Sequence, residues 1–470
     1  MKLLKKIVLI VFGVVVAVLV GYGVHYAWQN GPVGAGYKAK IFCSCVFVSN
    51  RKPDTILSED LTIPGLSFIN AEVNYKEKSV TASLPGLIKV KRRAVYREGL
   101  GCTLLIDTTE EELRKQAAAN PAPLPPDKKD LLWPVGDRLP DADFAPGVDV
   151  QKLNDALDDA FSEPDPDRPR RTRAVVVIYD SRIIAERYAP GFSKDTRLLG
   201  WSMTKSVNSA LIGILVGQGK LSVHDPAPVP EWREPGDPRG TITLDQLLRM
   251  SSGLEFMEEY ESNPTSDAGI MFFSTRDMAA FAAAKPLETE PGGKWSYSSG
   301  TSNILARIIR DSVGGPYTDY ISFPRRELFN RIDMRSAIIE PDASGTFVGA
   351  GYMYATARDW ARFGLLYLND GYWEGDRILP EGWVEYTRKP TPNTPPADQY
   401  GAQFWLNAGG EGRWLPGLPT DLYSARGHEG QYVTIIPSRD LVVVRMGLTR
   451  DEDAWDHESF VAAILEAVPK

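Results

Sequence analysis

Residues 200–205 read Gly-Trp-Ser-Met-Thr-Lys and place a hydroxyl and an amine at the start of a predicted helix. Ser202 and Lys205 are three residues apart, so they share one face of the first turn. Apolar residues follow at helical spacing: Val207, Ala210, Leu211, Ile214 and Leu215. A buried lysine with a lowered pKa can take the proton of a serine hydroxyl. The pair predicts a serine nucleophile with its base; a capping serine before a solvated lysine is the plainer alternative.

Two later segments carry groups that can complete such a site. Residues 297–300, Tyr-Ser-Ser-Gly, follow a Pro-Gly-Gly turn and precede an amphipathic helix, and a tyrosine at such a corner can relay a proton. Residues 427–431, Gly-His-Glu-Gly-Gln, lead into a strand, where flanking glycines let a ligand approach the backbone closely. The backbone N–H of Gln431 can then pair with that of Ser202 as an oxyanion hole.

In this order, the three segments resemble the motifs of the serine β-lactamase and penicillin-binding protein superfamily. The resemblance is nearest to its class C-like branch, which includes esterases, carboxypeptidases and 6-aminohexanoate-dimer hydrolases. Residues 243–254 and 349–364 are similar to further signatures of that family, so the resemblance covers residues 150–468. It implies that Ser202 is the acylated nucleophile and that Lys205 is its base partner.

The same resemblance assigns Tyr297 to proton transfer and places Ser299 and His428 in the substrate-binding motifs. Both depart from the usual pattern, which has asparagine at the place of Ser299 and lysine at that of His428. These changes weaken the case for β-lactams and peptidoglycan stem peptides, since histidine is largely neutral near pH 7. Arg426 lies two residues before His428, so on a strand both face one side, and we expect Arg426 to anchor a substrate carboxylate. Gly430 completes the expected oxyanion and substrate-binding set.

The expected function is therefore a serine hydrolase that acts through a covalent acyl-enzyme on a small amide or ester, an aminohexanoate dimer being one example. Two alternatives stay open. One is a β-lactamase or D,D-carboxypeptidase-type penicillin-binding enzyme; the other is a non-catalytic, penicillin-binding-like sensor or scaffold. The motifs imply no metal and no organic cofactor.

Other classes of protein lack their signatures in this chain. Residues 200–204 lack the second glycine of the α/β-hydrolase motif Gly-x-Ser-x-Gly, and the zinc-protease motif His-Glu-x-x-His does not occur. The net charge of −8 is not that of a typical nucleic-acid-binding protein, which carries an excess of basic residues. The acid pairs at 158–159 and 258–259 are interpreted as solvated faces rather than as a catalytic dyad.

The sequence predicts an α+β catalytic domain over residues 148–470. Residues 174–188 predict one hairpin, and residues 432–446 predict another near the opposite end of the chain. We expect a single antiparallel sheet built from both ends, flanked by helices and joined to an all-helical subdomain. This plan agrees with the β-lactamase/transpeptidase-like fold that the resemblance implies.

The first 147 residues lie outside the resemblance. Residues 1–29 combine three early lysines with the stretch 7–27, whose 21 residues include no acid, lysine or arginine. A bilayer-spanning helix needs about 20 residues, so this run predicts a transmembrane anchor, with a cleaved signal segment as the alternative. Either places the body outside the cytoplasm: anchored to the inner membrane on the periplasmic side, if the source is bacterial, or secreted.

Residues 30–107 predict a small β-rich module, because apolar and polar residues alternate there and residues 41–48 form a short apolar run. Prolines between residues 121 and 146 stiffen the chain, so residues 108–147 predict a linker or wrapping arm. The module shows no catalytic motif of its own.

Three cysteines occur in the chain, and all lie in this module. In an oxidising compartment either Cys43 or Cys45 can pair with Cys102, which leaves one thiol over. Three buried, small apolar side chains are the alternative. The sequence sets neither the pairing nor the oligomeric state.

Overall fold

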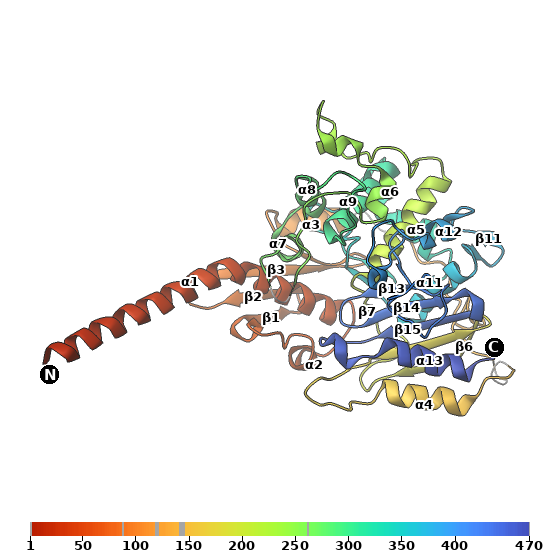
Figure 1. Cartoon of the computed structure of the whole chain (residues 1–470), viewed down its shortest axis with the longest axis horizontal. Helices are drawn as coiled ribbons and strands as arrows, with labels where there is room; N and C mark the ends of the chain where they lie inside the picture. The colour runs from red at the N-terminus through yellow and green to blue at the C-terminus, as the bar shows by residue number, and fades with distance from the viewer. Residues whose placement is uncertain (1, 87–88, 118–121, 141–145, 261–262, 470) are drawn as a thin grey trace.

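The computed structural model describes residues 2–86, 89–117, 122–140, 146–260 and 263–469. Its centre is a six-stranded sheet in the order β12-β13-β14-β15-β5-β6, with antiparallel neighbours throughout (Figure 1). The strands are β5 (Ala174–Tyr179), β6 (Arg182–Tyr188), β12 (Trp405–Leu406), β13 (Tyr423–Gly427), β14 (Gln431–Ile436) and β15 (Leu441–Met446). β15 pairs with β5, so the predicted sheet from both ends of the catalytic domain is confirmed.

Helices cover both faces of this sheet. In Figure 1 two of them lie along its lower side, and a third lies between the sheet and the helical subdomain. Alternate residues of β5 therefore enter different cores: Val175 and Val177 pack with the lower pair, whereas Val176 and Ile178 pack on the opposite face. A strand buried on both faces is a continuous apolar run. The three helices are α4 (Val150–Ala160) and α13 (His457–Ala467) below, and α11 (Ala357–Leu368) above.

The helical subdomain is inserted between β6 and β12 and carries the first two motifs. Its centre is the contact of α5 with α9, where the apolar stripe of α9 is buried. The apolar spacing along both helices predicts a buried face, and α5 is in fact buried over every residue from 203 to 215. The helices are α5 (Met203–Gly217), α6 (Leu244–Leu248), α7 (Asp267–Ser274), α8 (Met278–Ala283), α9 (Ser299–Val313), α10 (Tyr317–Pro324) and α12 (Trp383–Arg388).

Smaller elements complete the catalytic domain. One is a three-stranded sheet in the order β7-β9-β8, and its strand β7 directly precedes residues 200–205. Another is the pair of β10 with β11. The strands are β7 (Leu198–Leu199), β8 (Ile338–Ile339), β9 (Met353–Ala355), β10 (Tyr372–Trp373) and β11 (Asp376–Arg377). Its short helical turns are η2 (Pro230–Trp232), η3 (Pro238–Thr241), the π-helical η4 (Arg325–Phe329), η5 (Pro396–Asp398), η6 (Pro437–Arg439) and η7 (Glu452–Ala454), whereas η1 (Leu66–Phe68) belongs to the N-terminal region.

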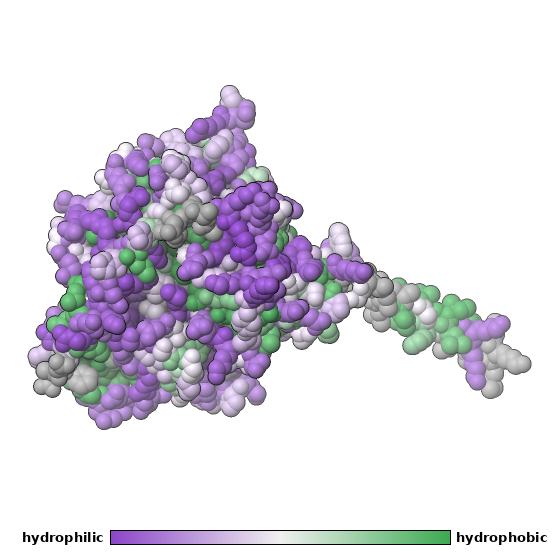
Figure 2. Space-filling view, turned by 180° about the vertical axis from the view of Figure 1, so that it is seen from behind, coloured by the Kyte–Doolittle hydropathy of each residue, from purple (hydrophilic) through white to green (hydrophobic). Residues whose placement is uncertain are grey.

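The N-terminal region combines one long helix with a four-stranded antiparallel sheet in the order β1-β2-β3-β4. The first part of α1 extends away from the body in Figure 1, and its apolar side chains form the green surface of the projection in Figure 2. Within the described residues, no helix meets the length and apolarity that crossing a membrane requires. The elements are α1 (Lys2–Phe47), α2 (Pro53–Ser58), β1 (Asn70–Asn74), β2 (Ser79–Leu84), β3 (Val90–Arg97), β4 (Gly101–Leu104) and α3 (Glu110–Ala117).

The apolar run at 41–48 was interpreted as part of a β-rich module, but residues 41–47 belong to α1. This end of the helix lies between the small sheet and the catalytic domain, where Ile41, Phe42 and Cys45 are buried. A helix that is covered on every side is apolar on every side, so it shows no helical period. A short run of this kind cannot be distinguished from a buried strand by its pattern.

A disulfide within the N-terminal region and ionic contacts to the catalytic domain meet in one buried cluster. A disulfide joins Cys43 of α1 to Cys102 of β4, and Cys45 is a buried free thiol. The carboxylate of Glu340, from the catalytic domain, accepts hydrogen bonds from Lys40, from Ser44 at 2.9 Å and from the backbone N–H of Cys102 at 2.5 Å. This buried cluster therefore contains residues from α1, β4 and the catalytic domain.

The described part of the proline-rich segment, residues 122–140, runs along the catalytic domain. The guanidinium of Arg362 in α11 donates to the backbone carbonyls of Pro134 at 2.9 Å and Gly136 at 2.8 Å. Arg358, one turn earlier, donates to the carbonyl of Asp137 at 2.8 Å. The segment thus wraps the domain through backbone contacts, which proline-rich chain can supply without regular structure.

Candidate active site

Ser202 and Lys205 lie at the N-terminus of α5, directly after β7. Ser202 is the residue before the helix, and among the described residues its side chain caps no backbone N–H. The Ser202 hydroxyl instead accepts a hydrogen bond of 3.0 Å from the Lys205 ammonium. The structure therefore disagrees with the alternative of a capping serine and a solvated lysine.

Lys205 is 1% exposed, and its Nζ makes three hydrogen bonds. It donates to Ser202 Oγ at 3.0 Å, to Ser299 Oγ at 3.1 Å and to the carbonyl of Ala350 at 2.8 Å. Burial lowers the pKa of Lys205 to about 8, although the negative charge of Glu258 acts in the opposite direction. A substantial neutral fraction at mildly alkaline pH makes this amine able to accept the serine proton.

Tyr297 enters the same site from the turn before α9. The side chain of Ser202 lies near its hydroxyl and acts to lower the pKa of the phenol, and Lys205 Nζ lies 4.8 Å from the centre of its ring. Tyr400 and Trp405 pack around the ring, with centroid distances of 5.9 and 5.3 Å. Burial raises the pKa of Tyr297, so the phenol stays protonated near neutral pH. These two pKa shifts favour the lysine as the group that can accept a proton and the tyrosine as one that can donate it.

Ser299 links this cluster to a residue that the sequence analysis did not assign to the site. The Glu258 carboxylate accepts hydrogen bonds from the backbone N–H of Ser299 at 2.8 Å and from its hydroxyl at 2.5 Å. The hydroxyl of Tyr260 also donates to Glu258 and lies 3.2 Å from Ser299 Oγ. The interpretation of Glu258 as part of a solvated acidic face is therefore wrong, because its half-buried carboxylate is bonded inside the site. Its only sequence signal is its place four residues after the 243–254 signature.

Arg426 and His428 contact different aromatic groups, although strand alternation predicted a shared side. The guanidinium of Arg426 lies 3.8 Å from the ring centre of Trp414 and 4.9 Å from that of Trp405. The ring of His428 instead packs edge-on to Trp201 at 5.7 Å and beside Tyr260 at 6.0 Å. The reason is that β13 ends at Gly427, so His428 belongs to the turn and the alternation does not reach it.

Gly430 is partly buried and Gln431 is buried at the end of that turn. The carbonyl of Gly430 accepts a hydrogen bond of 2.8 Å from Arg445, and its φ of 78° suits glycine. Gln431 directs its side chain inward, where it donates to the carbonyl of Gly447 at 2.8 Å, and its backbone pairs with Gly427 across the hairpin. The role of the Gln431 N–H in an oxyanion hole stays a prediction.

The structure thus brings together the predicted residues Ser202, Lys205, Tyr297 and Ser299, and it adds Glu258 and Tyr260. The two predicted binding residues lie beside different parts of this group: Arg426 contacts Trp405, which packs on Tyr297, and His428 contacts Tyr260. Among the residues that the structure describes, no group of three or more histidine, cysteine or acidic side chains can hold a metal ion. The chemistry available to the cluster is proton transfer coupled to nucleophilic attack by a serine.

Comparison with known proteins agrees with this geometry. A family model described as Beta-lactamase matches residues 156–465. The chain is 28% identical over 333 residues to a 6-aminohexanoate-dimer hydrolase from Paenarthrobacter ureafaciens, covering 65% of this chain and 81% of the relative. It is 24% identical over 289 residues to the D-alanyl-D-alanine-carboxypeptidase/endopeptidase AmpH from Escherichia coli, covering 54% of this chain and 72% of the relative. A penicillin-binding protein homolog from Caulobacter crescentus shares the fold, with a TM-score of 0.54 at 14% identity, covering 70% of this chain and 99% of that chain.

Proposed function

Because the chain belongs to the β-lactamase family, we propose that this serine hydrolase cleaves small amides or esters through an acyl-enzyme on Ser202. One observation carries the proposal: the amine of Lys205 is buried 3.0 Å from the Ser202 hydroxyl, with a pKa lowered to about 8. A hydroxyl becomes an effective nucleophile when a neighbouring base removes its proton during attack.

In the acylation step, Ser202 Oγ forms a bond to the substrate carbonyl carbon while its proton passes to Lys205. The carbon–nitrogen or carbon–oxygen bond of the substrate then breaks, and the leaving amine or alcohol takes a proton from the Tyr297 phenol. Lys205 can restore that proton, since the two side chains are adjacent. Water hydrolyses the acyl-enzyme in the second step, which releases the acid and regenerates Ser202.

Glu258 gives the lysine a nearby negative charge through Ser299. The chain of contacts runs from Lys205 Nζ to Ser299 Oγ at 3.1 Å and on to the Glu258 carboxylate at 2.5 Å. We propose that this carboxylate stabilises the protonated lysine that forms during acylation, because an opposite charge favours the ammonium form. Asparagine often stands at the position of Ser299 in this family. In this chain the Ser299 hydroxyl would connect Lys205 to Glu258 by hydrogen bonds.

For the substrate we propose a short linear amide or ester that carries a carboxylate. The 28% identity to a 6-aminohexanoate-dimer hydrolase supports a linear amide, and the guanidinium of Arg426 near Tyr297 supports an anionic group. Trp405 and Trp414 flank this cation and offer apolar surface to an aliphatic chain. Replacing Arg426 with alanine should raise the Michaelis constant for anionic substrates only; an unchanged constant contradicts the anchoring role.

The test of the function is intact-mass spectrometry of the protein incubated with a panel of substrates. The panel contains an activated short ester, an aminohexanoate dimer, a penicillin and a D-Ala-D-Ala peptide, with Ser202→Ala beside the wild type. A transient adduct on the wild type alone supports the proposal, and turnover of the dimer names the linear-amide class. Steady turnover of penicillin or the peptide favours the penicillin-binding alternative. A folded protein with no adduct and no turnover favours the sensor or scaffold.

We also propose that the body of the protein lies outside the cytoplasm. The Cys43–Cys102 disulfide supports this, because disulfides persist in oxidising compartments. Alkylation of acid-quenched cells that produce the protein should find both thiols oxidised and the Cys45 thiol free. Reduced Cys43 and Cys102 in most of the protein contradict the placement.

A further inference from the structure

One carboxylate joins the turn between β13 and β14 to the residue before the nucleophile. Glu429 is 6% exposed and has a φ of 62°, a conformation that residues other than glycine hold mainly where surrounding contacts require it. Its Oε2 accepts a hydrogen bond of 3.2 Å from the indole N–H of Trp201. Trp201, with a φ of 46°, directly precedes Ser202. The turn and the nucleophile segment therefore hold each other in place.

The second carboxylate oxygen of Glu429 contacts Arg450, which in turn contacts the N-terminal region. Oε1 accepts a hydrogen bond of 3.3 Å from Nε of Arg450. The other N–H groups of Arg450 donate to three oxygens of residues 59–62, at 2.5, 2.6 and 3.0 Å. Arg450 thus bridges the 427–431 turn and the N-terminal region, which lies outside the residues that match the family.

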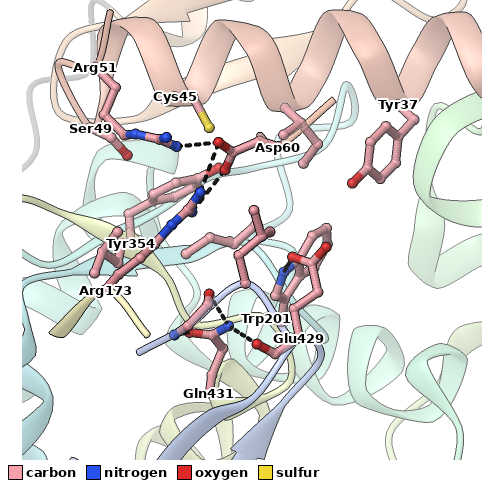
Figure 3. Close-up of a pocket in the computed structure, with 15 residues that line it drawn as sticks. Tyr37, Cys45, Ser49, Arg51, Asp60, Arg173, Trp201, Tyr354, Glu429 and Gln431 are labelled. Atoms are coloured by element: carbon pink, nitrogen blue, oxygen red, sulfur yellow. Dashed lines mark hydrogen bonds and ion pairs between the residues drawn. The ribbon is translucent and has the colours of Figure 1, made fainter. Parts of the chain in front are cut away.

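Residues 59–62 are themselves anchored. The carboxylate of Asp60, 6% exposed, accepts hydrogen bonds from Arg51 at 2.6 Å and from Arg173 at 2.9 Å. Figure 3 shows Asp60 between these two guanidinium groups. Arg173 precedes β5, so this contact connects the end of α2 with the central sheet.

Elsewhere between α1 and the turn, packing is incomplete. Tyr37 and Cys45 of α1 and Gln431 of β14 line a cavity of ≈ 30 Å³ together with Glu429 and Trp201 (Figure 3). Side chains that face a cavity make fewer packing contacts than those in a close-packed core. The hydrogen bonds through Arg450 and Glu429 form a direct polar link between the turn and the N-terminal region beside this cavity.

We propose that residues 59–62 act through Arg450 and Glu429 as positioning residues for Trp201 and Ser202. This inference rests on the proposed function, because it assigns the N-terminal region a role in placing the same nucleophile. Small displacements of a reacting group cost rate more than they cost binding. The expected signature is a slower reaction of Ser202 with little change in substrate affinity.

The first test measures the rate at which a fluorophosphonate modifies Ser202 in the full-length protein, together with kcat and KM for the ester. Arg450→Gln and Glu429→Gln should each slow the modification by about tenfold or more, and Thr62→Val by about threefold, with KM within about twofold. The double variant Arg450→Gln/Glu429→Gln should be no slower than the slower single variant, because both interrupt one chain. Additive losses, or unchanged rates in folded variants, overturn the proposal.

Arg168→Gln is the matched control. Arg168 forms an ion pair of 2.6 Å with Asp451, the neighbour of Arg450, and both side chains are more exposed than Arg450. The control removes an arginine contact from the same loop without touching the chain to Glu429. It should react at the wild-type rate.

The second test is hydrogen exchange of residues 427–431, which does not depend on activity. Thr62→Val and Arg450→Gln should speed exchange in this turn about threefold or more, and Arg168→Gln should not. Equal exchange in all proteins overturns the proposal. If the wild type does not react with the fluorophosphonate, the proposed function fails, and the exchange result alone decides whether the N-terminal region positions the turn.

Discussion

The Ser202–Lys205 pair and the N-terminal region are held by contacts that differ in their range along the chain. The hydrogen bond from Lys205 to Ser202 spans three positions of the chain, whereas that from Lys40 to Glu340 spans 300 and that from Arg450 to Thr62 spans 388. Local contacts follow from helix geometry once the helix forms. Long-range contacts exist only after the two regions have docked. A short motif can therefore predict the nucleophile pair, whereas the contacts that support the site cannot be predicted from neighbouring residues.

The largest effect expected is on the nucleophile pair. Ser202→Ala should abolish the acyl adduct, and Lys205→Ala should slow acylation by at least about 10³-fold, since a triad-like group acts as a unit. Intact mass and single-turnover kinetics measure both. Circular dichroism and thermal unfolding of Ser202→Ala should match the wild type, because the Ser202 side chain caps no backbone N–H within the described structure. A Lys205→Ala protein that acylates at the wild-type rate would show that the base is another group.

The next largest effect is expected at the buried ion pair of Lys40 with Glu340, which joins the N-terminal region to the catalytic domain. Glu340→Gln leaves the Lys40 ammonium buried without its counter-charge and should lower the free energy of unfolding by about 3–5 kcal/mol. Urea denaturation measures this loss. Lys115→Met is the matched control, because its pair with Glu111 in α3 is exposed and should leave stability unchanged. Equal losses in the two variants would contradict the role of burial.

A smaller loss is expected from the covalent link. Cys102→Ser opens the 59-residue loop closed by Cys43 and should lower the free energy of unfolding by about 2–4 kcal/mol. Cys45→Ala is the control, because this thiol is buried but unpaired with another cysteine. Reduction with dithiothreitol should reproduce the Cys102→Ser result and leave Cys102→Ser itself unaffected. Insensitivity of the wild type to reductant would contradict the prediction.

The smallest effect is a shift in the pH profile. Acylation needs neutral Lys205, whose pKa is about 8, so kcat/KM should rise with pH through a midpoint near that value. The charge of Glu258 raises the pKa of Lys205, so Glu258→Gln should move the midpoint to lower pH. Glu255→Gln, with an exposed side chain in the same loop, is the control. A midpoint that stays or rises in Glu258→Gln contradicts the proposed charge contact.

Several features were predictable because they depend on neighbours in the chain. The sheet from both ends follows from two apolar runs with turns, at 174–179 and 441–446, and the structure pairs them. The helix after Ser202 follows from its apolar spacing. The family follows from motifs in a set order, and the family model matches residues 156–465.

Other features were not predictable, for identifiable physical reasons. The run at 41–47 lost its helical period because it is covered on all sides. Glu258 lies in a loop without periodicity, so nothing local distinguishes it from the solvated Glu255. Strand alternation predicted that His428 and Arg426 face the same side, but β13 ends at Gly427, so His428 lies in the turn and contacts other groups.

The sequence alone predicted the candidate catalytic residues Ser202, Lys205 and Tyr297 and the helices beside them, since spacing along a helix and apolar patterning act within a few residues. Only the tertiary structure decided that Cys43, rather than Cys45, pairs with Cys102, because this depends on which side of α1 faces β4. It alone also decided that Glu258 reaches Ser299 and that residues 59–62 reach Glu429 through Arg450. These contacts join segments far apart in the chain, and burial, which sets their strength, exists only in the folded protein.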